Sequence, residues 1–241
     1  MWGFAGPLRA VFRRRSFVDV VTIACIVLYV ASLVMDPAAV LRGRGPLSIF
    51  SPSGQALLDL GATGVLPWQM GRWWTVLTAI YLHGGPLHLL FNVLWIRQLG
   101  PAVEELYGPA RLVVVFTVAG VVGFVASNML GYGLTIGASG SIFGLLGAMV
   151  AFGQKRGGTL GARVLREYGQ WALLLFVLGF LMEGVNNVAH AGGFAGGFAA
   201  GLVLSLAEHQ AETAVDQLLA VACIGLTLLG FALALWTSFA A

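Results

Sequence analysis

Long runs of apolar residues alternate with short polar stretches along the chain. A helix rises about 1.5 Å per residue, so roughly 20 apolar residues cross the hydrocarbon of a membrane. Six or seven runs approach that length, and we expect spans at residues 17–35, 86–107, 112–130, 139–154, 168–182, 188–207 and 215–236. The pattern predicts an all-α, polytopic membrane helix bundle with a six-helix core and a seventh, C-terminal transmembrane helix.

The same pattern divides the chain into three parts. Residues 1–16 form a basic N-terminal segment, residues 17–207 the six-helix core, and residues 208–241 an acidic linker with the seventh helix. Nearly fifty residues separate the first two spans, and we expect their apolar piece at 73–82 to lie on or partly in the membrane. The first run lacks a small-residue cleavage site, so we interpret it as a retained anchor.

Composition and charge agree with a membrane protein and argue against a nucleic-acid partner. Hydrophobic residues make up 59% of the chain and charged residues 10%, whereas soluble domains carry about 25% charged residues. The formal charge is +3, but the basic residues lie between the apolar runs and form no patch. Ten fall on one side of the predicted membrane and three on the other: Arg9, Arg13, Arg14, Arg15, Arg97, Arg111, Lys155, Arg156, Arg163 and Arg166 against Arg42, Arg44 and Arg72.

Because positive charge marks the cytoplasmic side, we expect a cytoplasmic N-terminus and an outer long loop. The protein would then sit in the inner or plasma membrane of the cell.

The fourth span is unusually short. Residues 139–154 form a helix of about 24 Å, whereas the hydrocarbon is about 30 Å thick. Glycine-rich residues 131–138 precede it and carry few helix signals. Irregular backbone at membrane depth persists only where it is buried or lines a wet cavity. The sequence therefore predicts a pocket open to water around Ser139, lined by Gly131, Gly133 and Gly137.

Few polar side chains fall inside the spans, and such residues are usually functional. His88 and Asn92 are four residues apart and share one face of the second span, where both can donate hydrogen bonds. They could equally serve as contacts between helices. His83 lies just before that span, and His209 lies in the polar linker after the sixth span, where we expect it to be solvated.

Two stripes of small residues predict a close contact between the fourth and sixth spans. His190 shares its face with Gly193 and Gly197, and Gly140, Gly144 and Gly147 form a similar stripe beginning beside Ser139. Small residues let helices approach closely, so the stripes could be a packing seam alone. The seam would also bring the His190 imidazole to the Ser139 hydroxyl, and a serine needs an adjacent base to become a nucleophile.

Ser139 begins the fourth span, where it could act as a helix cap. A helix start also offers free backbone N–H groups and a positive dipole end, which stabilise an oxyanion. Ser141 has the same chemistry but lies about 200° around the helix, so only one of the two serines can face His190.

Three motifs, in order across residues 68–206, resemble those of the rhomboid family of intramembrane serine proteases. Gly137-Ala-Ser139-Gly140 resembles its GxSG motif, and the segment from His83 to Asn92 resembles its histidine-rich second helix. Ala189-His190-Ala-Gly-Gly193-Phe-Ala-Gly-Gly197 resembles its AHxxGxxxG motif. The resemblance implies a six-helix rhomboid-like core.

By position, the resemblance implies that Ser139 is the nucleophile and His190 the general base of a dyad without an aspartate. It implies an oxyanion hole made by His88, Asn92 and the Ser139 backbone N–H, and a structural role for His83. The implied supporting residues are Gly137, Gly140, Phe143, Gly193 and Gly197. No cofactor and no metal are implied.

Two features depart from the family pattern. The outer loop reads Arg72-Trp73-Trp74-Thr75 where the family often has Trp-Arg, so the loop anchor could be wired differently. Some members carry a tyrosine four residues after the serine, where this chain has Phe143. Its ring can still pack on His190, but it offers no hydroxyl.

The function implied is that of an intramembrane serine endopeptidase that cleaves single-pass membrane proteins near the outer end of their transmembrane segment. Its partners would be those substrates and the lipid bilayer, with no nucleic acid; the oligomeric state stays open. An H-E-x-x-H metalloprotease motif is missing, and the four aspartates fall near span ends or in loops. A catalytically dead relative would typically lack Ser139 or His190, and a small-solute transporter would need polar residues in spans three and seven.

Overall fold

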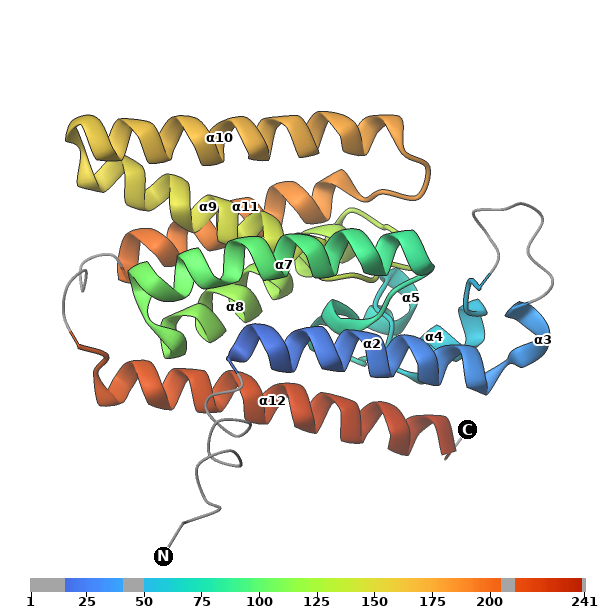
Figure 1. The fold of residues 1–241 in the computed structure, drawn as a ribbon. Coiled ribbons are helices and arrows are strands. Elements are labelled where there is room, and N and C mark those ends of the chain that lie inside the picture. Colours follow the sequence, from blue (N-terminus) through green and yellow to red (C-terminus); the bar gives the residue numbers. More distant parts are fainter. Residues whose placement is uncertain (1–15, 41–49, 205–210, 240–241) are drawn as a thin grey trace, which may run out of the picture.

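The computed structural model describes residues 16–40, 50–204 and 211–239, and helices make up nearly all of their regular structure (Figure 1). The long helices are α2 (Phe17–Met35), α7 (Pro86–Tyr107), α8 (Pro109–Met129), α9 (Ser139–Arg156), α10 (Gly158–Leu181), α11 (Asn187–Leu204) and α12 (Ala214–Phe239). Short helices are α3 (Pro37–Val40), α4 (Gly54–Asp59), α5 (Val65–Gln69), α6 (Thr75–Thr78) and the 3₁₀ turn η1 (Ala79–Tyr81).

The protein is an integral membrane helix bundle. Five helices, α2, α8, α10, α11 and α12, are long and apolar enough to cross a membrane. A sixth span results if α6 and η1 are joined to α7 across their 93° bend. The core of six spans plus a seventh therefore stays a prediction, because α9 is not in this set. Its last turn carries Lys155 and Arg156.

Local sequence signals set several helix ends. α7 and α8 both begin at a proline, which suits the first turn because its missing N–H would have no partner there. Gly108 separates these helices with a φ of 93°, a left-handed conformation that favours glycine. The ends predicted for the first two spans agree with α2 and α7.

The predicted fifth span is too short at its start. It was expected to begin at residue 168, but α10 begins at Gly158. The first turns of α10 are held against α9, because a Cβ on Gly161 would lie 2.5 Å from the Gly153 carbonyl oxygen. This backbone contact lets a helix with a polar first half continue out of the apolar region.

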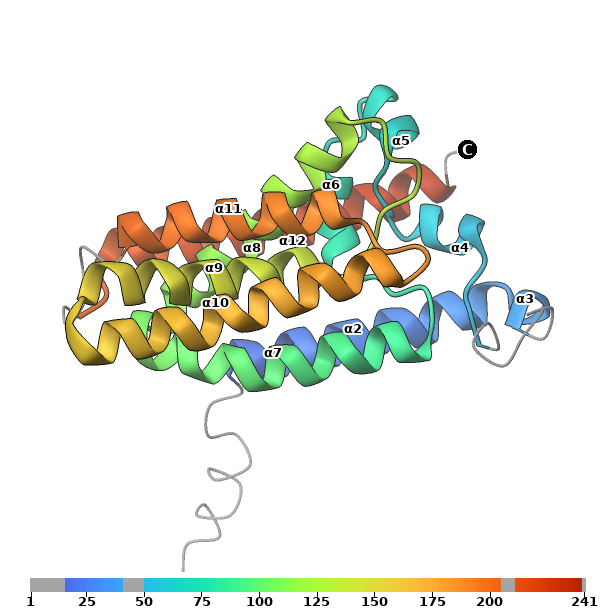
Figure 2. The same cartoon turned by 90° about the horizontal axis from the view of Figure 1, so that it is seen from above.

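α9 is the central helix of the bundle, packing against α7, α8, α10 and α11. Every residue from Gly140 to Met149 is buried. Figure 2 shows α9 running between α10 and the pair α8 and α11. Ser139, at its first position, therefore lies inside the fold.

The loop between the first two spans packs into the protein. Val76, Leu77, Ala79 and Ile80 are all buried, so the apolar piece at 73–82 is largely core and not a membrane-surface segment. The Thr78 hydroxyl donates to the Gly61 carbonyl at 2.6 Å and fastens α6 to the turn after α4. These short helices cover the end of the bundle where α9 begins.

Some expectations concern residues outside the described ranges. These are the N-terminal arginines up to Arg15, Arg42, Arg44, His209 and the last residues of the predicted sixth span. The division at residues 16 and 207 stays a prediction. Among the basic residues within the described ranges, Arg72 lies at the end of the bundle near Ser139. The other six lie at the opposite end: Arg97, Arg111, Lys155, Arg156, Arg163 and Arg166.

A buried ion pair fastens α12 to the start of α8. Arg111 Nη2 lies 2.9 Å from Asp216 Oδ2, and the two side chains are 3% and 10% exposed. Asp216 also accepts from the backbone N–H of Thr213 at 2.8 Å, which caps α12. Just before it, Glu212 accepts from the Ala110 N–H at 2.6 Å and caps α8. We call these contacts of Glu212 and Asp216 the latch.

We expect Asp216→Ala to lower the free energy of unfolding by about 2 kcal/mol, because the buried Arg111 guanidinium loses its carboxylate and α12 loses its cap. Thermal or denaturant unfolding in detergent measures it. The control is Arg97→Gln, which removes the exposed Arg97–Asp19 pair and should cost about 0–1 kcal/mol. Equal losses in the two variants would contradict the importance of the latch.

Candidate active site

The structure brings the predicted serine and histidine together. Ser139 is the first residue of α9, and His190 lies in the first turn of α11. The Ser139 Oγ is 2.9 Å from the His190 Nε2, which is hydrogen-bond distance. His190 is buried and Ser139 is half-buried, so the pair sits at the edge of the core. The expected contact between these side chains is therefore present.

The close approach of α9 and α11 explains this contact. A Cβ on Gly193 would lie 2.1 Å from the Gly140 carbonyl oxygen, and one on Gly197 would lie 2.0 Å from that of Gly144. Any side chain at these positions would separate the helices. The packing seam expected from the two glycine stripes therefore exists.

The Ser139 side chain does not cap its helix. Ala138 occupies the cap position of α9, and no side-chain hydrogen bond is made there. The hydroxyl pairs with His190 instead. Ser141 is fully buried, and its Oγ would meet a Cβ on Gly120 of α8 at 2.4 Å. As expected, Ser141 points away from the histidine.

Phe143 fixes the plane of the His190 ring. The two rings stack with centroids 4.3 Å apart and an interplanar angle of 16°. Phe143 is itself buried and lies one turn after Ser139 on the same face of α9. The phenylalanine thus packs on the imidazole as expected, without supplying a hydroxyl.

Asn187 supports the other side of His190, and the sequence did not reveal it. Its Oδ1 lies 3.1 Å from the His190 Nδ1, and its Nδ2 donates to the Phe176 carbonyl of α10 at 3.2 Å. Because the Nδ2 is used in this way, the oxygen must face the histidine. His190 then carries its proton on Nδ1, and Nε2 is free to accept the Ser139 proton. The spacing of three residues between Asn187 and His190, which puts both on one face of a helix, was the sequence signal that could have predicted this contact.

His88 and Gly137 meet beside the site. Gly137 has a φ of 117°, and a Cβ there would lie 2.6 Å from the His88 Nε2. Glycine is therefore required twice, for the left-handed backbone and for the room that the imidazole takes. The His88 ring consequently lies over the backbone that leads into Ser139. Gly131 and Gly133, which were expected to line the pocket, are exposed, and a Cβ on either would meet nothing within 4 Å.

Asn92 is buried one turn below His88, and its Nδ2 donates to the His88 carbonyl at 2.7 Å. Its second N–H is not used by that bond. His83 is fully buried, with Nδ1 3.2 Å from the Tyr81 carbonyl and its ring edge-on to His88 at 5.0 Å. Within the described ranges, His, Cys, Asp and Glu side chains do not gather in groups of three that could hold a metal ion.

Hydrogen bonds hold the irregular segment before Ser139 in place. The Gly137 N–H donates to the Ala79 carbonyl at 2.9 Å, and Thr135 forms an antiparallel bridge with Thr63. The Asn186 Nδ2 donates to the Ser127 and Thr135 hydroxyls at 2.5 and 3.2 Å. The Asn186 Oδ1 accepts from the Ala189 N–H at 3.1 Å. The Asn186 side chain thus joins the segment that leads to Ser139 (the serine loop, residues 131–138) to the start of α11, the helix that carries His190.

Comparison with known proteins identifies relatives of this chain. A model of the rhomboid domain matches residues 70–207. The rhomboid protease GluP of Bacillus subtilis (strain 168) is 35% identical over 149 residues, which cover 59% of this chain and 28% of that protein. The rhomboid-like protease 3 of Toxoplasma gondii is 28% identical over 178 residues, 72% of this chain and 64% of that protein.

The RHOMBOID-like protein 4 of Arabidopsis thaliana is 32% identical over 164 residues, 67% of this chain and 42% of that protein. The chain therefore spans less than two thirds of the length of each of these three relatives.

We expect Gly197→Ala to destabilise the protein by about 1–3 kcal/mol, because the new methyl group overlaps the α9 backbone and forces the helices apart. Unfolding in detergent measures the effect. Gly169→Ala is the matched control, because this glycine also lies inside a helix but a Cβ there meets nothing within 4 Å. It should be neutral or stabilising by up to about 1 kcal/mol. Similar losses for both variants would rule out close packing as the role of Gly197.

Proposed function

The chain belongs to the rhomboid family, and we propose that it is an intramembrane serine endopeptidase in which Ser139 is the nucleophile and His190 its general base. The hydrogen-bond distance of 2.9 Å between the Ser139 Oγ and the His190 Nε2 carries this proposal. A serine at the edge of a membrane bundle, joined to a buried imidazole with a defined tautomer, is suited to acyl transfer.

The first step is attack on a substrate carbonyl. His190 Nε2 takes the Ser139 proton while the Oγ forms a bond to the carbonyl carbon. The imidazolium then gives its proton to the leaving amine, and water hydrolyses the acyl-enzyme by the reverse transfer. Asn187 accepts a hydrogen bond from the Nδ1–H throughout, which stabilises the ring in one orientation. Phe143 blocks rotation of the ring out of this plane.

The tetrahedral intermediate carries a negative oxygen that needs donors. The Ser139 N–H belongs to the first turn of α9 and has no partner within that helix. His88 approaches the same segment over Gly137, and Asn92 keeps an N–H that its bond to the His88 carbonyl does not use. We assign the oxyanion hole to the Ser139 N–H, His88 and Asn92. Gly137 leaves room for His88, and Gly140, Gly193 and Gly197 support the site by letting α9 and α11 approach closely.

We propose single-pass membrane proteins as substrates, cleaved near the outer end of their transmembrane segment. A helix hides its peptide bonds in internal hydrogen bonds, so a stretch that unwinds easily is the better target. Entry is lateral, past α10. Only Gly161, Ala172 and Gly179 of this helix are buried, and Phe180, Leu181 and Met182 near its end are exposed.

Opening at α10 would break the bond from Asn187 to the Phe176 carbonyl but leave Asn187 on His190.

The orientation follows from the charges. Six basic residues of the described chain lie at the end of the bundle away from Ser139, which we assign to the cytoplasm. The candidate site then opens toward the outer side, in the inner or plasma membrane of the cell. The whole chain would divide into a basic segment at 1–16, a protease core at 17–207 and an acidic linker with a last helix at 208–241.

We expect Ser139→Ala and His190→Ala each to abolish cleavage of a model single-pass substrate in proteoliposomes. Both variants should still fold, although His190→Ala should lower the unfolding temperature because the buried ring stacks on Phe143. The matched control is Ser141→Ala, which removes a buried hydroxyl two residues away that has no hydrogen-bond partner in the described structure. It should cleave normally. Near-normal cleavage by either of the first two variants would end the assignment of the pair.

Asn92 and Asn187 should differ in how strongly their loss lowers kcat, because the first is proposed to donate to the oxyanion and the second to orient His190. Asn92→Ala should lower kcat by roughly 10²–10³, the usual effect of losing an oxyanion donor. Asn187→Ala should lower kcat about tenfold, the effect of one hydrogen bond of about 1.4 kcal/mol. Steady-state kinetics on the model substrate measures both.

Aspartate variants provide the contrast. Asp at position 187 keeps the oxygen that accepts from His190, so Asn187→Asp should recover much of the activity. Asn92→Asp should recover none, because a carboxylate cannot donate to an oxyanion. Unchanged kcat with a raised KM for Asn92→Ala would instead assign Asn92 to substrate binding.

The need for unwinding is tested with two substrates that differ only in the outer part of the transmembrane segment. We expect the version containing Gly and Ser to be cleaved and the all-Leu version to resist, because leucine keeps the helix closed. Mass spectrometry of the products locates the cut. Equal cleavage of both would refute the unwinding requirement, and a cut at the cytoplasmic end would refute the proposed orientation.

A further inference from the structure

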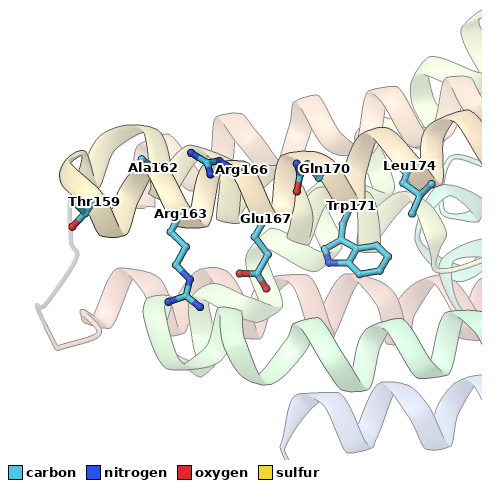
Figure 3. Close-up of a pocket in the computed structure, with 8 residues that line it drawn as sticks. All are labelled: Thr159, Ala162, Arg163, Arg166, Glu167, Gln170, Trp171 and Leu174. Carbon is cyan, nitrogen blue, oxygen red and sulfur yellow. The ribbon is translucent and has the colours of Figure 1, made fainter.

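A concave region lies along the first half of α10, away from Ser139. It has a volume of about 650 Å³ and is lined by two adjacent stripes of that helix. One stripe is Arg163, Glu167 and Trp171, and the other is Arg166, Gln170 and Leu174. Figure 3 shows Arg163, Glu167 and Trp171 extending from α10 toward α7. We call this region the α10 hollow.

We propose that the α10 hollow binds an anionic phospholipid, with its phosphodiester at Arg163 and Arg166 and an acyl chain along Trp171 and Leu174. This inference rests on the membrane bundle and is independent of the proposed catalysis.

The charges in the hollow favour an anion. Its two arginines face one carboxylate, that of Glu167, so its formal charge is +1. No ion pair within the described residues includes Arg163 or Arg166. A guanidinium presents a fork of N–H donors that matches phosphate oxygens. Gln170 and Glu167 add a donor and acceptors for headgroup hydroxyl groups.

The order of side chains along α10 matches the layers of a membrane. From Arg163 to Leu174 the helix rises about 16 Å, from charged to apolar residues. Trp171 lies between the two, and tryptophan favours the boundary between headgroups and acyl chains. The hollow also lies at the end of the bundle that carries six basic residues, where cytoplasmic anionic lipids gather.

α7 lies beside the hollow, on the side toward which Arg163, Glu167 and Trp171 extend (Figure 3). The rings of Trp95 in α7 and Trp171 in α10 meet edge to face, with centroids 5.2 Å apart. This ring pair is a direct contact between α7 and α10 beside the hollow. A single acyl chain can lie along such an aromatic surface, and a bound lipid would join α7 to α10 at the end opposite to the proposed substrate entry.

Brominated lipids test the proposal, because bromine quenches the fluorescence of a nearby tryptophan. The full-length protein is placed in phosphatidylcholine vesicles, and brominated phosphatidylglycerol or brominated phosphatidylcholine is added in steps. We expect stronger quenching by brominated phosphatidylglycerol at equal mole fraction. Trp171→Phe should reduce this excess, because Trp171 lines the hollow and only Trp95, which contacts it at 5.2 Å, remains beside the bound lipid.

Charge variants show where the preference arises. The double variant Arg163→Gln/Arg166→Gln should weaken the preference for phosphatidylglycerol roughly 25-fold, about fivefold for each charge. The matched control is Arg97→Gln/Lys155→Gln, which removes two positive charges from the same end of the bundle but outside the hollow. It should keep the preference. Both double variants should unfold close to the wild-type temperature, since all four side chains are exposed and the Arg97–Asp19 pair contributes only about 0–1 kcal/mol.

Three results would overturn the proposal. Equal quenching by the two brominated lipids would mean that the hollow does not distinguish them. Equal losses in both double variants would reduce the effect to general attraction by the basic end. Displacement of the brominated lipid by a soluble acidic peptide would assign the hollow to a protein segment instead.

Discussion

Gly193 and Gly197 of α11 lie directly on the backbone of Gly140 and Gly144 in α9, so no side chain separates the two helices. In a membrane the hydrophobic effect does not drive helices together, and close packing of small residues takes its place. The contact also sets the height of α11 against α9, and therefore which residues meet at its end. His190 reaches Ser139 because it lies one turn before Gly193 on the same face. The same glycines that pack the bundle thus bring the two reactive groups together.

A second constraint acts on the segment between α8 and α9, which is irregular although it lies at the edge of a membrane bundle. Its polar groups must find partners within the protein, because lipid offers none. Asn128 donates to the Thr63 hydroxyl at 2.9 Å, Thr75 donates to the same hydroxyl at 3.0 Å, and Asn186 reaches Thr135. This network joins α6 and the segment between α4 and α5 to the starts of α9 and α11. It therefore holds Ser139 and His190 at the end of the two helices, while the glycines hold them along the helix contact.

The sequence predicted most of this arrangement where the signal is local or periodic. Proline at the start of α7 and glycine at its end give its bounds, and glycine spacing gives the seam. The start of α10 was missed because Thr159 to Glu167 look like a polar loop, and only the backbone contact of Gly153 with Gly161 reveals a helix. Asn187 was missed because its side chain is oriented by the Phe176 carbonyl of α10, and the sequence does not show that contact between two helices. Arg111 and Asp216 are 105 residues apart and no periodicity connects them.

The last helix illustrates how distant parts of the chain reach the candidate site. The latch fixes one end of α12 to the start of α8, and the other end packs on α4 and α6. Phe231 meets Tyr81 with ring centroids 5.9 Å apart, and a Cβ on Gly230 would lie 3.2 Å from the Thr78 methyl group. The neighbouring Ala79 carbonyl accepts from the Gly137 N–H. α12 therefore supports residues 78–81, which hold the serine loop through the Ala79 carbonyl. It contributes no side chain to the candidate site, and its own anchor, the latch, lies at the opposite end of the bundle.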